Sequence, residues 1–231
     1  MVQQSAVVCP EIIGREREMA SLRHAFNEVG SGHGQIIIIS GEAGIGKSRL
    51  VDEFKQTLLN TDVTVFQGIS FEQDQTFPFS LWIEGIRSIL TNLTDKSPEA
   101  DSFTNRGVIT TRESFRQLIA PFARDFIKLF PEIENFLPEV VPSPALDSEA
   151  EKHRLFETWA KFFTRLSQGS PLLMILEDLH WSDDVSLDLL QFLTRRILSQ
   201  PIERMKPLPV LTTFWHILIG NTWPKKSIWS A

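Results

Sequence analysis

Eight residues near the start of the chain have the types and the spacing of a loop that binds phosphate groups. They run from Gly41 to Ser48 and follow the apolar segment 35–40, so a buried strand leads into glycines and then into a lysine. Glycines allow backbone angles at which successive N–H groups face an anion, and a helix after the loop adds the positive end of its dipole. In such a P-loop the lysine reaches the β- and γ-phosphates of a nucleotide and the serine ligates magnesium. The residues assigned to this nucleotide site are Gly41, Glu42, Ala43, Gly44, Ile45, Gly46, Lys47, Ser48 and Arg49.

Two carboxylates follow a second apolar segment. Residues 171–176 are apolar without alternation, as a strand covered on both faces requires, and Glu177 and Asp178 come next. Carboxylates at the carboxyl end of a parallel strand lie beside the phosphate crevice. We assign Glu177 to the magnesium shell, through water, and Asp178 to orienting the water that attacks the γ-phosphate. The plainer alternative is that both carboxylates solvate a strand end and cap a helix.

The rest of the chain predicts an α/β fold, a three-layer P-loop NTPase core with a parallel sheet and helices on both faces. A second strand is expected at 63–68. Thr110 and Glu113 stand at capping-box spacing before an apolar stripe that runs to Phe130. Further helices are predicted after Lys47, after Pro78, along the stripe from Leu155 to Leu166, and over 185–198. Prolines between 131 and 149 predict a surface connection.

Composition favours a compact domain and gives little support for nucleic-acid binding. The 231-residue chain has a formal net charge of −6 and is 42% hydrophobic, so it can bury a core and is not strongly basic. Cys9 is the lone cysteine, which excludes an internal disulfide and fits a reducing cytoplasm. No window approaches the roughly 20 apolar residues of a membrane span. We expect a soluble cytoplasmic protein without a membrane segment.

Three segments together resemble the AAA-type ATPase domain of bacterial signal-transduction ATPases with numerous domains. They are 12–18, 40–50 and 176–183, of which the last reads Leu-Glu-Asp-Leu-His-Trp-Ser-Asp and is the most discriminating. That family includes large LuxR-type regulators and multidomain kinases and cyclases, and it is related to origin-recognition ATPases. The resemblance extends from residue 11 to about residue 200. It implies ATP with Mg²⁺ as the ligand.

The same resemblance implies roles for residues outside the P-loop. It places Ile13, Gly14 and Arg15 against the adenine of ATP. The pattern of charged and apolar residues over 16–26 by itself predicts an amphipathic helix, and this structural explanation stays open for most of the segment. The pair His180–Trp181 matches the family string without an evident role in chemistry, and we expect both residues to be packed structural ones.

The end of the chain departs from the resemblance. A buried strand is expected at 208–214, and in the family an arginine that senses the γ-phosphate commonly ends this strand. Trp215 stands at that position here, and Ile217–Ile219 are expected to pair at most as an edge strand. We therefore expect a truncated or frame-altered member of the family in which the C-terminal lid is absent. The expected divisions are an N-terminal tail (1–10), a P-loop ATPase domain (11–215, including the proline-rich connection 131–149) and a divergent C-terminal tail (216–231).

Three function classes are compatible with these residues. The first is an ATP-binding module of a bacterial signalling or transcriptional regulator, which acts as a conformational switch. Its hydrolysis of ATP is expected to be slow, because the order Glu177 then Asp178 reverses the usual order of such acids. The alternative is a catalytically silent or vestigial interaction fragment. A P-loop kinase that acts on a small molecule is disfavoured because no arginine-rich lid segment is visible. The expected ligand is ATP, and the sequence is compatible with either a protein partner or self-association.

Overall fold

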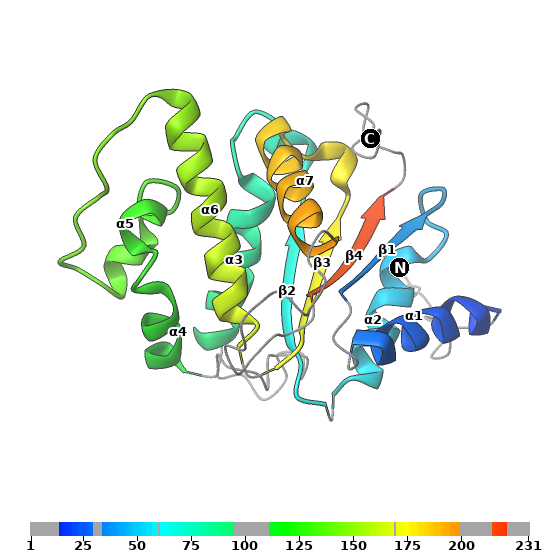
Figure 1. Ribbon diagram of the computed structural model, residues 1–231. Helices are drawn as coiled ribbons and strands as arrows, with labels where there is room; N and C mark the ends of the chain where they lie inside the picture. Colours follow the sequence, from blue (N-terminus) through cyan, green and yellow to red (C-terminus); the bar gives the residue numbers. More distant parts are fainter. Residues whose placement is uncertain are drawn as a thin grey trace, which may run out of the picture.

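In the described part of the chain, four parallel strands form one sheet, with helices on both of its faces (Figure 1). The computed structural model describes residues 14–29, 34–59, 61–94, 111–168, 170–198 and 214–220, and only the backbone of 91–94, 197–198 and 214–220. The strands are β1 (Gln35–Ser40), β2 (Thr64–Ile69), β3 (Leu172–Glu177) and β4 (Phe214–Gly220). Their order across the sheet is β1-β4-β3-β2. Because all strands point the same way, the P-loop after β1 and the acids after β3 both lie at the carboxyl end of the sheet.

Seven α-helices are present in the described part of the chain. They are α1 (Glu16–Val29), α2 (Lys47–Thr57), α3 (Ser80–Thr94), α4 (Arg112–Ile119), α5 (Ala123–Phe126), α6 (Ser148–Leu166) and α7 (Asp184–Leu198). Short 3-10 turns occur at Glu72–Asp74, Pro131–Asn135 and Leu179–Trp181. None of the described helices has both the length and the apolar character that a membrane span requires.

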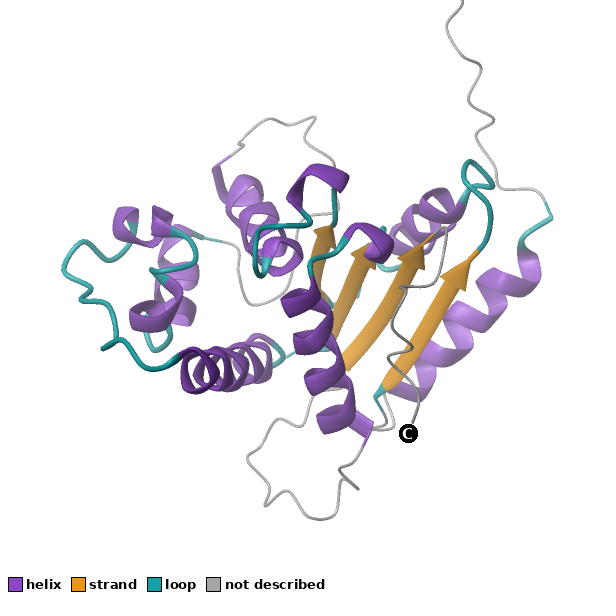
Figure 2. Ribbon diagram, turned by 90° about the horizontal axis from the view of Figure 1, so that it is seen from above, coloured by secondary structure: helices purple, strands orange, loops and turns teal. Residues whose placement is uncertain are grey.

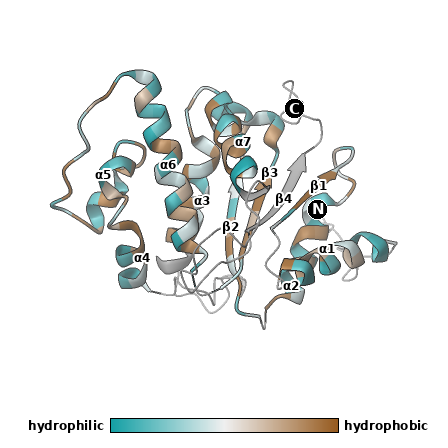
Figure 3. Cartoon of the chain, viewed as in Figure 1, coloured by the Kyte–Doolittle hydropathy of each residue, from teal (hydrophilic) through white to brown (hydrophobic). Residues whose placement is uncertain are grey.

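Each face of the sheet has its own hydrophobic cluster. On one face α1 and α2 pack against Leu173 and Ile175 of β3, with Phe54 of α2 fully buried. The opposite face is covered by the larger group of helices, and Phe163 of α6 meets Phe66 of β2 edge to face at 4.9 Å between ring centroids. Figure 2 shows helices on either side of the four strands. Apolar colouring follows β3, whereas α1 and α6 carry both colours (Figure 3).

β3 is buried along its whole length, which confirms the interpretation of its unalternating apolar sequence. Its residues point alternately into the two clusters, Leu172, Met174 and Leu176 to one side, Leu173 and Ile175 to the other. The strand that carries Glu177 is therefore held from both faces.

The predicted helices are present, with one correction at the start of α4. Thr111, and not Thr110, is the N-cap, and its capping-box partner is Ser114 instead of Glu113. A serine hydroxyl can both donate and accept, so it closes the box in place of the expected carboxylate. The apolar stripe from Phe115 to Phe130 is buried as predicted, but it runs through two short helices, α4 and α5, and the turns that flank them, with Pro121 between the helices.

The last described strand lies more centrally in the sheet than predicted. β4 pairs with β1 on one side and with β3 on the other, so Ile217–Ile219 belong to an interior strand and not to an edge strand. An interior strand needs its N–H groups for both neighbours, and the segment 214–220 supplies them without a proline. Of the strand predicted at 208–214, only Phe214 is among the described residues.

The register of β4 also corrects the position expected for the missing arginine. Trp215 pairs with Gln35 and Leu173, at the amino ends of β1 and β3. Trp215 therefore lies at the end of the sheet opposite to the P-loop, and Gly220 is the β4 residue beside Ser40.

Candidate functional site

The P-loop connects β1 to α2 with an exposed backbone. Gly44 and Gly46 adopt left-handed conformations, with φ of +78° and +91°. Gly46 is the N-cap of α2, and its carbonyl accepts the first helical bond, from Leu50 N–H at 3.0 Å. Left-handed residues inside a turn let consecutive N–H groups converge on one point. This loop, open at the amino end of a helix, has the form of an anion site.

Lys47 closes over the loop that precedes it. Its ammonium donates to the carbonyl oxygens of Gly41 and Glu42, at 3.0 and 2.8 Å. The charge therefore lies at the mouth of the loop, where a phosphate oxygen is a stronger acceptor than a neutral carbonyl. Arg49 follows in the first turn of α2, where it is half-buried.

Ser48 and Glu177 meet although they are far apart in the sequence. Ser48 Oγ donates to Glu177 Oε2 at 2.8 Å, which joins the start of α2 to the end of β3. Glu177 is buried, with 8% of the residue exposed. A hydroxyl and a carboxylate are the hard oxygen donors that magnesium takes together with substrate phosphates, so the residues at this position fit a magnesium site.

Two residues that sequence reasoning missed hold the other oxygen of this carboxylate. Gln67 of β2 donates through Nε2 to Glu177 Oε1 at 2.7 Å, and Lys55 of α2 donates to Gln67 Oε1 at 3.1 Å. Lys55 is itself paired with Asp52 at 2.7 Å. The available signal was a glutamine on the face of β2 that packs against α2, where the neighbouring positions are apolar.

Asp178 has a different environment from Glu177. It adopts a left-handed conformation, φ +53°, and its side chain is 41% exposed. Its Oδ1 lies 4.0 Å from His180 Nδ1, an atom that is buried without a hydrogen-bond partner in the described part of the chain. The rings of His180 and Trp181 contact each other at 4.8 Å between centroids. The expected packing of these two residues is thus what the structure has.

Asp183, at the end of the same string, is a structural clamp. Its buried carboxylate accepts hydrogen bonds from Phe79 N–H, Ser80 N–H and the Ser80 hydroxyl at 3.1–3.2 Å, and from Ser186 N–H at 2.8 Å. These donors belong to the starts of α3 and α7, so one side chain caps two helices. The alternative that Glu177 and Asp178 cap a helix is not what the structure shows, because Asp178 precedes the 3-10 turn Leu179–Trp181 without a side-chain capping bond, and the capping carboxylate is that of Asp183.

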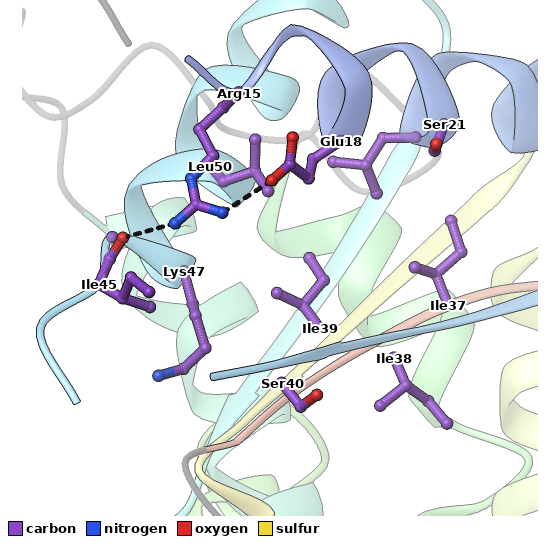
Figure 4. Close-up of a pocket in the computed structure, with 12 residues that line it drawn as sticks. Arg15, Glu18, Ser21, Ile37, Ile38, Ile39, Ser40, Ile45, Lys47 and Leu50 are labelled. Atoms are coloured by element: carbon purple, nitrogen blue, oxygen red, sulfur yellow. Dashed lines mark hydrogen bonds and ion pairs between the residues drawn. The ribbon is translucent and has the colours of Figure 1, made fainter. Parts of the chain in front are cut away.

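A pocket of about 320 Å³ lies beside the P-loop, between α1 and β1 (Figure 4). Arg15 forms an ion pair with Glu18 at 2.7 Å and donates to the Ile45 carbonyl at 3.2 Å, so α1 is tied to the loop. The hydrogen bond from Arg15 holds the pKa of Glu18 below its usual value. Ile37 and Ile39 point from β1 toward α1 and supply apolar walls.

Part of the segment expected to contact adenine, Ile13 to Arg15, lies at this pocket. Arg15 lines the pocket, and Gly14, with φ +79°, precedes the helix. Ile13 lies outside the described residues. The amphipathic helix predicted over 16–26 is present as α1, with Leu22 buried against α2 and the sheet.

A parallel sheet with this loop after β1, and with Glu177 at the end of β3 bonded to the loop serine, defines an α/β protein of the P-loop nucleotide-binding class. Residues 11–210 match the family described as the AAA ATPase domain. The chain belongs to that family.

Two curated relatives match most of this chain but only a small part of their own length. A hybrid signal transduction histidine kinase G of Dictyostelium discoideum is 26% identical over 183 residues, which cover 79% of this chain and 5% of the kinase. An uncharacterized protein of Rhizobium meliloti (strain 1021) is 25% identical over 197 residues, 83% of this chain and 18% of that protein. The chain thus corresponds to one segment of much longer proteins, one of which is named for signal transduction.

Proposed function

We propose that this chain binds ATP with Mg²⁺ and acts as a slow ATPase switch. The observation that carries the proposal is the hydrogen bond between Ser48 and Glu177, 2.8 Å long, which joins the two predicted motifs at one point. The P-loop backbone and Lys47 would hold the phosphates, and Ser48 and Glu177 would hold the metal. Mg²⁺, when bound, supplies positive charge that neutralises the phosphate oxygens.

The environment of Asp178 supports slow hydrolysis. We assign this carboxylate to orienting water, but it is short and solvent-exposed and lies 4.0 Å from His180. A poorly fixed acid contributes less to the rate because correct placement is the main part of catalysis at such sites. Slow hydrolysis would prolong the ATP-bound state, so that a partner could recognise it.

The pocket between α1 and β1 supports a place for the nucleoside. It adjoins the P-loop and combines the apolar walls of Ile37 and Ile39 with the polar side chains of Arg15 and Glu18. A base stacks on apolar side chains while polar groups fix its orientation. The signalling role follows by analogy with the relative named as a signal transduction kinase, and the protein that receives the signal is left to experiment.

Binding is tested by titrating ATP and Mg²⁺ while following tryptophan fluorescence, since Trp181 follows the β3 carboxylates. Lys47→Ala should weaken Mg-ATP binding about 10- to 100-fold, because a charge-assisted hydrogen bond to phosphate is lost. The matched control is Lys161→Ala, which removes an exposed lysine of α6. Phosphate release in the same samples measures turnover. Equal ATP affinity in both variants and in the wild-type chain would reject the P-loop assignment.

A further inference from the structure

We propose that Gln67 is a positioning residue for the magnesium shell, and that Lys55 fixes the orientation of its amide. The assignment rests on the proposed function, because it concerns the carboxylate expected to hold the metal. Neither residue belongs to the motifs that define the P-loop or the β3 acids.

The first step concerns the two oxygens of Glu177, which have separate donors. Oε2 accepts from Ser48 at 2.8 Å and Oε1 accepts from Gln67 at 2.7 Å. Glu177 is a buried residue, 8% exposed, so water is largely excluded and both carboxylate oxygens need donors. Glutamate also has one more rotatable bond than the aspartate usual at this position. The bond from Gln67 removes that extra freedom.

The second step concerns the amide of Gln67, which can bond in only one sense. Lys55 is a donor only, so Gln67 must present its oxygen to that ammonium, at 3.1 Å. Its NH₂ group then faces Glu177, which accepts only. The Lys55 side chain is 12% exposed, and its ammonium also pairs with Asp52, so the ammonium is itself held in place. Each group in the series fixes the next.

The third step is that one helix holds the carboxylate at two points. Ser48 and Lys55 are seven residues apart on α2, two turns, and therefore lie on the same side of the helix. Ser48 contacts Glu177 directly, and Lys55 acts on it through Gln67 of β2. Outer partners of this kind orient a metal ligand and commonly change metal affinity about 10- to 100-fold when removed.

The consequence is a separation of two binding constants. The P-loop backbone and Lys47 would contact phosphate without help from Gln67, whose amide bonds to Glu177 and Lys55. Loss of Gln67 should raise the Mg²⁺ concentration needed for half-maximal ATP binding about 10- to 100-fold. ATP binding in EDTA should stay within about twofold of the wild-type value, the range expected for an independent site. A general loosening of the fold would weaken both.

The test compares Gln67→Leu with Gln56→Leu, a matched change at an exposed position of α2. ATP binding is followed by tryptophan fluorescence at increasing Mg²⁺ and again in EDTA, with thermal unfolding recorded for every variant. In the Glu177→Ala background the Gln67→Leu change should have no further effect on the Mg²⁺ requirement, because Gln67 acts through that carboxylate. Lys55→Met leaves Gln67 in place and should shift the Mg²⁺ requirement in the same direction by less.

The outcomes distinguish the two proposals. Absence of Mg-ATP binding by the wild-type chain overturns the proposed function, and this assignment with it. Normal wild-type binding with an unchanged Mg²⁺ requirement in Gln67→Leu overturns the assignment alone, as does an equal shift in the Glu177→Ala background. If Gln67→Leu does not fold, Lys55→Met decides by the same criterion.

Discussion

Gly46 of the P-loop has a left-handed conformation and is the N-cap directly before α2. A Cβ built there meets nothing within 4 Å, so the cost of a side chain is conformational and not steric. Gly46→Ala should lower the free energy of unfolding by about 1–2 kcal/mol, the usual cost of left-handed backbone for alanine. Urea unfolding measures it.

Gly41→Ala is the internal comparison for this prediction. Gly41 is in the same loop without a positive φ, and its added Cβ would lie 3.2 Å from a methyl group of the exposed Ile45 side chain. Alanine at such a site reduces the entropy of the unfolded chain, so Gly41→Ala should be neutral or stabilising by up to about 1 kcal/mol. Equal losses in both variants would show that φ at Gly46 is not the cause.

Single residues were predictable where the motif is local. The P-loop occupies consecutive positions, so its spacing alone located Lys47 and Ser48. The bond from Gln67 to Glu177 spans 110 residues, and no local pattern connects the two. The contact between Ser48 and Glu177 follows from the general rule that parallel strands present their carboxyl ends at one edge.

Among the elements, α3 and α7 depend on one carboxylate for their amino ends. Asp183 accepts from Ser80 of α3 and Ser186 of α7, and also from Phe79 N–H directly before α3, where φ is +64°. Asp183→Ala should lower the free energy of unfolding by about 2–4 kcal/mol, which is roughly the cost of removing two N-cap side chains. Chemical unfolding followed by circular dichroism measures the loss.

Asp147 provides the matched control because it caps one helix and is exposed. Its Oδ1 accepts from Ala150 N–H at 3.0 Å, at the start of α6. Asp147→Ala should cost about 1 kcal/mol. If the two variants lose the same stability, Asp183 does not act as a double cap.

The elements were predictable in proportion to how local their signals are. The helices were predicted from the spacing of their apolar residues, and β3 was predicted from its unbroken apolar sequence. The cap of α4 was misplaced by one residue because Thr110 and Thr111 are both suitable caps, and only the backbone conformation distinguishes them. The interior position of β4 was missed because the apolar residues Ile217–Ile219 do not show by themselves how many strands they pair with. Pairing with both β1 and β3 is a long-range property.

For the whole molecule, β4 is the element that joins the two halves of the site. β1 carries the P-loop and β3 carries Glu177, and β4 pairs with both. The bond between Ser48 and Glu177 therefore spans a strand supplied by the last part of the described chain. Both the stability of the fold and the binding of nucleotide should therefore depend on β4.

A chain that ends after residue 213 tests this dependence. Without β4, the described β1 loses its pairing and β3 keeps only β2, so unpaired N–H and C=O groups would face apolar surroundings. We expect the shortened chain to lose cooperative thermal unfolding and Mg-ATP binding together, and to elute as aggregates in size-exclusion chromatography. The comparison is the 231-residue chain under the same conditions. A cooperative transition within a few degrees of that chain, with binding retained, would show that β1 and β3 are held together by the helices instead of by β4.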